Sequence, residues 1–208
     1  HIYNLDTKKT AKVSMDNPME YVPRIKWTQD PNQLCVFNMN RHQNELELLL
    51  TDARTGQTSL LLKEKNQWYI DIHDDLTFLK DGEHFLWLSE KDGWNHVYRY
   101  DMEGNLVNQI TKGDWEVTAF HGVDEAEQTI YYQAAKTSPM QREIYTSTLD
   151  GKKTKMISKG EGWHRAQFSS TFDYYVDNFS SMEKAPVYTV FNKKGKTVRV
   201  IEDNADME

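Results

Sequence analysis

The sequence predicts an all-β fold, specifically a fragment of a β-propeller. Three observations lead to this prediction: short strands recur in a repeat of about 45 residues, turn glycines are nearly evenly spaced, and no window shows helical periodicity. The turn glycines are Gly56, Gly104, Gly151 and Gly195, separated by 48, 47 and 44 residues. Because a propeller blade holds four strands in about 40–45 residues, each repeat matches one blade.

Every repeat has the same order of strands. An opening strand is followed by an aromatic or β-branched strand and then by a closing hairpin, at 24–28, 34–39 and around 48–56 in the first full repeat. Glycine in the hairpin supplies the positive φ that a tight turn requires. We therefore expect four four-stranded antiparallel blades. They should span residues 21–63, 68–111, 115–158 and 163–202.

Residues 1–15 are expected to be outer strands of a preceding blade, so that 1–208 would form one partial propeller domain. A β-sandwich is the alternative all-β fold, but a sandwich has no reason to repeat one order of strands four times. Propellers close with four to eight blades. Either four blades close alone, or the chain is part of a larger ring.

Composition excludes several functional classes. Twenty-five basic and 32 acidic residues give a net charge of −7, which argues against a nucleic-acid partner. A mean hydropathy of −0.79 without a long apolar run argues against a membrane span in this segment. Cys35 is the sole cysteine, so no internal disulfide framework is expected. The chain starts at His1 without a signal-like segment, and we expect both ends to be cuts within a longer protein.

Several motifs occur along the chain in a specific order. They are YVPRIKW at 21–27, NRHQN at 40–44, SEKDGWNHVY at 89–98, TKGDWEV at 111–117, SPMQREIY at 138–145, and residues 164–169 with 186–188. Together they resemble, over nearly the whole chain, the propeller of dipeptidyl peptidase IV and its relatives in the prolyl oligopeptidase family. Each motif is weak alone, whereas the six in this order are specific.

This resemblance implies an eight-bladed propeller joined to an α/β-hydrolase domain that would follow Glu208. Enzymes of that family release N-terminal dipeptides (X-Pro or X-Ala) from peptides with a Ser/Asp/His triad, and this chain would be the second half of the propeller. The chain contains no G-x-S-x-G nucleophile turn. The family's paired glutamates lie in a segment that resembles nothing here. We therefore assign no catalytic residue and no cofactor, and expect the chain alone to be inactive.

Asp71 and His73 are the candidate substrate-binding residues. In the family, the loop after the tryptophan that matches Trp68 approaches the peptide-binding funnel and contributes an aromatic residue and an arginine. By this resemblance the matching positions lie near Asp71 to His73, where neither residue type is kept, so the loop would face the funnel with a different chemistry. The alternative is a solvated loop between Tyr69 and Leu76.

The other polar clusters favour structural roles. Seven histidines form neither H-x-H nor H-E-x-x-H, and the acidic run 71–75 lacks the register of a Ca²⁺ loop, so no metal site is expected. His96 and His164 are expected to form hydrogen bonds within their blades. Residues 89–93 carry Ser and acidic side chains but predict a hairpin turn rather than a triad.

One tryptophan recurs near the start of each blade. These residues are Trp27, Trp68, Trp115 and Trp163. We expect them to pack in the core between neighbouring blades. A row of exposed aromatic platforms for carbohydrate stacking is the alternative.

Three functions compete. The leading one is a non-catalytic propeller portion that gates peptide access to a serine exopeptidase, with peptide substrates and its own hydrolase domain as partners. The second is a freestanding propeller-like scaffold that binds proteins, and the third is a carbohydrate-binding propeller. A downstream G-x-S-x-G domain in the parent gene would separate the first two. Self-association through open blade faces is expected, and the family resemblance suggests the periplasm or cell surface.

Overall fold

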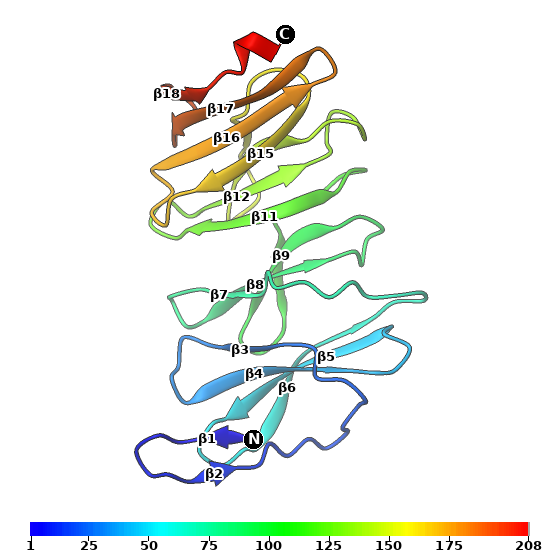
Figure 1. Cartoon of the computed structure of the whole chain (residues 1–208). Coiled ribbons are helices and arrows are strands. Elements are labelled where there is room, and N and C mark those ends of the chain that lie inside the picture. Colours follow the sequence, from blue (N-terminus) through cyan, green and yellow to red (C-terminus); the bar gives the residue numbers. More distant parts are fainter. Residues whose placement is uncertain (208) are drawn as a thin grey trace. The chain divides into compact units, whose positions relative to one another are not determined.

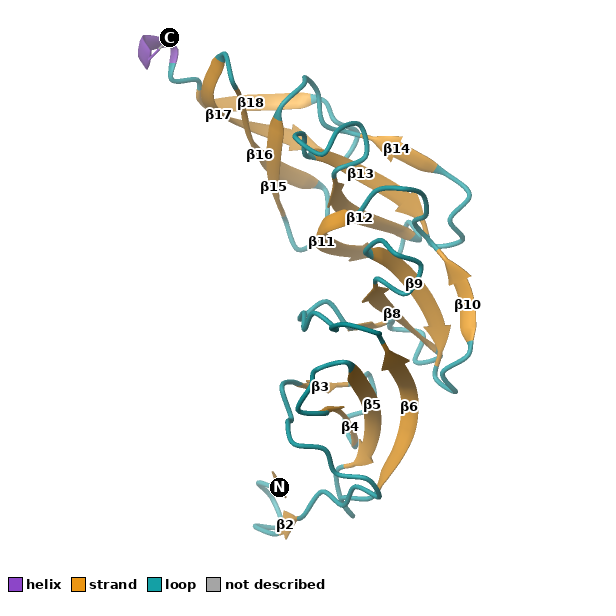
Figure 2. Ribbon diagram, turned by 90° about the vertical axis from the view of Figure 1, so that its right-hand side faces the viewer, coloured by secondary structure: helices purple, strands orange, loops and turns teal. Residues whose placement is uncertain are grey.

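The computed structural model describes residues 1–207, which form eighteen strands and one short 3-10 helix, Ala205–Met207. The strands make four four-stranded sheets and one two-stranded hairpin, and within each sheet they follow one another in chain order (Figures 1 and 2). Within the described part of 20–200 there is no helix. These findings confirm the predicted all-β fold of four four-stranded blades and part of a fifth.

The N-terminal hairpin is short, and each of the first two sheets begins with a short strand. The hairpin comprises β1 (Ile2–Tyr3) and β2 (Thr10–Ala11). The first sheet comprises β3 (Ile25–Trp27), β4 (Gln33–Met39), β5 (Glu45–Asp52) and β6 (Thr58–Lys65). The second sheet comprises β7 (Thr77–Phe78), β8 (His84–Ser89), β9 (His96–Asp101) and β10 (Leu106–Gln109).

The third and fourth sheets follow the same plan. The third comprises β11 (Val117–Asp124), β12 (Thr129–Ala134), β13 (Glu143–Thr148) and β14 (Thr154–Met156). The fourth comprises β15 (Trp163–Phe168), β16 (Tyr174–Ser181), β17 (Lys184–Asn192) and β18 (Thr197–Glu202). Contacts divide the chain into two compact units, residues 1–87 with 100–107 and residues 88–99 with 108–208.

The core of each unit comes mainly from the middle strands of the sheets, because only these strands have a neighbour on both sides. In the first unit, Phe37 on β4 and Leu48 on β5 are buried, and the Phe37 ring meets Trp87 edge-on at 5.8 Å. In the second unit, Tyr131 on β12 and Tyr175 on β16 belong to one buried cluster. Burying the apolar surface of such aliphatic and aromatic side chains is the main favourable term in folding.

The predicted turn glycines are confirmed. Gly56, Gly104, Gly151 and Gly195 all have positive φ, between 71° and 83°, and each lies in the hairpin between the last two strands of its sheet. At Gly104 a β-carbon would lie 1.9 Å from the carbonyl oxygen of Leu61. This turn therefore requires glycine both for its backbone conformation and for its close approach to the chain.

The prediction that the four recurring tryptophans pack in the core is correct for Trp115 but wrong for the other three. Trp115 is 9% exposed, whereas Trp27, Trp68 and Trp163 are 51%, 79% and 48% exposed. The reason is position in the sheet. Trp27 and Trp163 lie on β3 and β15, which are edge strands, and Trp68 lies in the loop between β6 and β7.

The predicted hydrogen bonds of His96 and His164 are confirmed. The Nδ1 atom of His96 lies 3.0 Å from the Thr111 hydroxyl, and its Nε2 donates to the Gly113 carbonyl at 3.0 Å. Both nitrogens of His164 face acceptors, at 2.6 Å from Asp177 Oδ2 and 3.2 Å from the Gly160 carbonyl.

Among the residues described, no helix has the length and apolar character needed to cross a membrane.

Candidate functional site

Asp71 lies in a groove of about 380 Å³ in the first unit, which we call the Asp71 groove. Its walls come from the residues before β3, the end of β4 with the following turn, and the loop after β6. The lining residues are Tyr21, Val22, Pro23, Arg24, Met39, Gln43, Tyr69, Asp71 and Ile72.

Backbone hydrogen bonds hold these walls together. Tyr21 and Met39 exchange both of their N–H···O bonds, at 3.0 and 2.9 Å, which attaches the segment before β3 to the end of β4. The N–H of Ile70 donates to the carbonyl of Gln43 at 2.8 Å, which fixes the loop after β6 against the β4–β5 turn. Asp71 therefore extends from a backbone that is anchored directly beside it.

The groove combines exposed aromatic rings with one unpaired carboxylate. Tyr21 and Tyr69 are each about half exposed. The guanidinium of Arg24 is paired with Asp74, with 2.5 Å between Nε and Oδ1, so its charge is locally offset. Asp71 makes no hydrogen bond or ion pair with any residue that the structure describes. Tyrosine faces beside a carboxylate suit a cationic group.

His73 is placed differently from Asp71. Its ring lies 4.4 Å from the ring of Trp87, and its Nδ1 accepts a hydrogen bond from the backbone N–H of Asp75 at 3.2 Å. Burial raises the pKa of the Asp75 carboxyl. The structure thus brings Asp71 together with the groove tyrosines and packs His73 against the sheet. Substrate contact by either residue stays a prediction.

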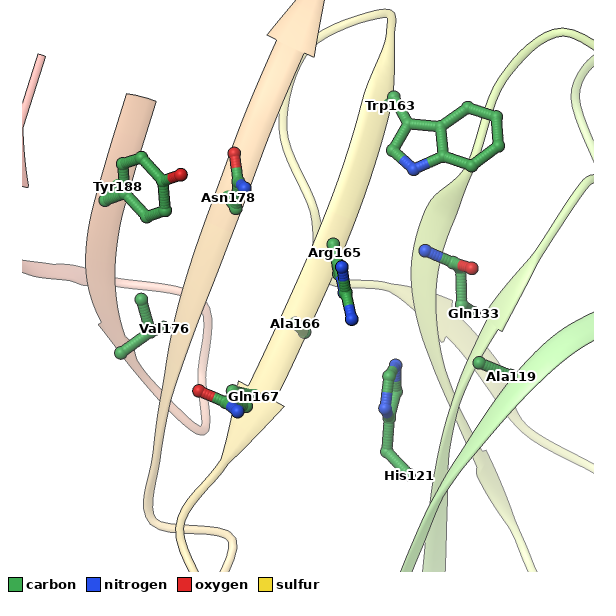
Figure 3. Close-up of a pocket in the computed structure, with 10 residues that line it drawn as sticks. All are labelled: Ala119, His121, Gln133, Trp163, Arg165, Ala166, Gln167, Val176, Asn178 and Tyr188. Carbon is green, nitrogen blue, oxygen red and sulfur yellow. The ribbon is translucent and has the colours of Figure 1, made fainter. Parts of the chain in front are cut away.

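A second site in the described residues was not predicted from the sequence. A cavity of about 610 Å³, the β15 cavity, lies in the second unit along β11, β12 and β15–β17 (Figure 3). Its polar and aromatic lining residues are His121, Gln133, Trp163, Arg165, Gln167, Asn178 and Tyr188. No three His, Cys, Asp or Glu residues among 1–207 are grouped so that they could hold a metal ion.

Sheet register explains how this lining arises. Arg165 pairs with Asn178, and Asn178 pairs with Tyr188, so the three side chains share one face of the fourth sheet. On β15 the neighbouring residue His164 is buried on the opposite face. This period-two pattern from 163 to 167 fixes the face on which Arg165 lies, but no local sequence signal indicates the cavity, because other strands complete it.

His121 lies at an irregularity of β11. The register with β12 shifts between Phe120 and Gly122, which leaves His121 as an extra residue of a bulge. Bulges redirect side chains and are frequent beside functional sites. The Nε2 atom of His121 is buried without a hydrogen-bond partner among the described residues, and burial lowers the pKa of its imidazole to about 4. The ring is therefore neutral near pH 7.

Comparison with known proteins decides the family. The family profile described as "Dipeptidyl peptidase IV (DPP IV) N-terminal region" matches residues 1–186. The chain belongs to this family. Dipeptidyl peptidase 4 of Arthroderma otae is 23% identical to this DPP IV-family chain over 216 residues, and that of Trichophyton rubrum is 29% identical over 192 residues. The alignments cover 98% and 88% of the chain, but only 28% and 25% of these relatives.

Solved structures agree with this DPP IV assignment. The crystal structure of Porphyromonas gingivalis dipeptidyl peptidase 4 matches 98% of the chain with a TM-score of 0.90 and 35% identity. A putative dipeptidyl aminopeptidase IV from Bacteroides ovatus shares the fold, with a TM-score of 0.83 and 22% identity over 97% of the chain. The chain spans 29% and 32% of these two proteins. The resemblance expected from the motifs is thereby confirmed.

Proposed function

We propose that the chain is the non-catalytic propeller portion of a DPP IV-like serine exopeptidase that releases X-Pro or X-Ala dipeptides. The family match over residues 1–186 carries this proposal. The sequence lacks the G-x-S-x-G turn that presents a catalytic serine in α/β-hydrolases. In this proposal the triad belongs to a hydrolase domain outside the sequence, and the propeller controls which peptides reach it.

The proposed contribution of the propeller is selection before chemistry. A restricted passage admits unfolded peptides and excludes folded proteins, as other gating elements of enzymes do. Within the passage, the Asp71 groove would contact the peptide. Its carboxylate and the rings of Tyr21 and Tyr69 favour a cationic side chain or an ammonium group, each contact contributing about 0.5–1 kcal/mol at an exposed site.

The experiment is a comparison of Asp71→Asn with the unmodified complete protein, with Asp16→Asn as a matched surface control. For peptides that carry Lys or Arg, Asp71→Asn should lower kcat/KM about threefold, which corresponds to one exposed ion pair. For neutral peptides it should leave kcat/KM unchanged, and Asp16→Asn should change neither. Equal effects of Asp71→Asn on both peptide classes would contradict a role of the groove in selection.

The parent reading frame tests the wider proposal. A G-x-S-x-G domain encoded downstream is the expected result. A reading frame without one would contradict the peptidase assignment and favour the freestanding scaffold.

A further inference from the structure

We propose that the β15 cavity is a binding site for a carboxylate attached to an apolar or aromatic group. This inference goes beyond gating by the propeller, and only the identity of the natural ligand as a peptide rests on the proposed function. Two sources could supply the carboxylate, the C-terminus of a peptide or an Asp or Glu side chain.

The charge of the lining points to an anion. The chain has a net charge of −7, yet the ten residues that line the cavity include no Asp or Glu, and Arg165 is the one with a full charge at neutral pH. Two acidic residues near this row have partners of their own. Asp177 on β16 binds His164 on the opposite face. Glu202, which pairs with Tyr188 from the neighbouring strand β18, accepts hydrogen bonds from the backbone N–H groups of Asp203 and Asn204.

Hydrogen-bonding capacity at the cavity is unused. The side chains of Arg165, Gln167 and Asn178 make no hydrogen bond or ion pair with any described residue. In the view of Figure 3, Arg165 lies between Asn178 on one side and His121 and Gln133 on the other. A guanidinium presents its N–H donors as a planar fork that fits the two oxygens of a carboxylate. Asn178 and the unpartnered Nε2 of His121 can add donors beside that fork.

The remaining walls suit the apolar part of such a ligand. Trp163 and Tyr188 expose their rings, and Val176 pairs with Gln167 in the neighbouring cross-strand row. The guanidinium of Arg142 packs against the Trp163 ring at 4.7 Å, which holds the indole in place and adds a second positive charge near the cavity. A volume of about 610 Å³ falls in the usual range of small-ligand sites.

Titration calorimetry on the purified chain tests the site with three probes: N-acetyl-Ala-Phe with a free carboxylate, the same peptide as its C-terminal amide, and N-acetyl-Glu-Phe amide. We expect the free acid to bind at least about tenfold more tightly than the Ala-Phe amide, since hydrogen bonds to charged groups contribute that much or more. Arg165→Gln should remove this preference, whereas the exposed Arg41→Gln control should retain it. Arg165 is exposed, so thermal melting should show both variants folded.

The outcomes separate the possibilities. Tight binding of the free acid alone assigns the site to peptide C-termini, tight binding of the Glu peptide alone assigns it to acidic side chains, and tight binding of both extends it to either source. Equal affinity for all three probes, or an unchanged preference in Arg165→Gln, would overturn the proposal. The assay involves no hydrolysis, so its result does not depend on whether the complete protein is a peptidase.

Discussion

His164 and Asp177 form a close contact between two side chains in the second unit. Both are buried, and the 2.6 Å contact joins β15 to β16 while the other ring nitrogen faces the Gly160 carbonyl. Donation from both nitrogens requires the imidazolium form. Burial acts to lower the pKa of His164, but the hydrogen bond and charge of Asp177 outweigh it, so the pKa is raised.

This pair predicts a pH-dependent stability. An unfolded histidine titrates near pH 6.5. Because the native pKa is raised, the stabilisation should be complete below about pH 6.5 and should fall as the pH rises through the native pKa. The difference in unfolding free energy between the wild type and His164→Gln should be about 3 kcal/mol near pH 6 and smaller near pH 9. Urea denaturation at each pH measures it, and a difference that does not change with pH would refute the ionised pair.

The sequence predicted the role of a residue only where that role depends on neighbours in the same blade. It predicted that His96 and His164 hydrogen-bond within their blades, but not that Asp177, 13 residues away, is the partner of His164. Asp71 could be proposed from the family resemblance. Arg165 and His121 could not, because the β15 cavity depends on a bulge in β11 and on the register of three other strands.

Among the elements, the hairpin turns have the clearest sequence requirement, which is a glycine with positive φ. Gly104 and Gly82 both have positive φ, at 83° and 70°, but only Gly104 meets the chain closely. Gly82→Ala should therefore cost about 1 kcal/mol, from backbone conformation alone. Gly104→Ala adds a clash with the Leu61 carbonyl and should cost at least about 2 kcal/mol. Urea midpoints compare the two variants, and equal losses would contradict the close packing of this turn.

Turn glycines were predictable because the conformation they supply is a property of a few adjacent residues. Tryptophan burial was not, because it depends on whether a strand lies in the middle or at the edge of its sheet. Trp115 precedes β11 and stacks on Tyr132 at 6.2 Å, whereas Trp163 lies on the edge strand β15 and faces solvent. The repeat gives the strands their order, but it does not say which side of each strand is covered.

For the molecule as a whole, the edge strand β18 of the fourth sheet is exposed along its full length among the described residues. All six residues of β18 are exposed, including Val198, Val200 and Ile201. Exposed apolar edge strands pair readily with other chains. Burying several hundred Å² of this surface would contribute several kcal/mol, at about 25 cal/mol per Å², before the cost of association.

We therefore predict that the chain self-associates. Sedimentation velocity over about a hundredfold range of concentration should show a growing fraction of larger species, against the opposition of the −7 net charge. Val200→Lys, which places a charge on the edge, should shift the equilibrium towards the monomer. A single monomeric species at every concentration would show that the exposed strand does not drive association.

We propose that this DPP IV-family chain serves a peptidase without performing the hydrolysis itself. The decisive assay is hydrolysis of a dipeptide-Pro chromogenic substrate by the purified chain. Since the sequence has no nucleophile turn, the predicted rate equals that of buffer alone. Turnover that follows the chain through purification and is blocked by a serine-reactive phosphonate would contradict the account.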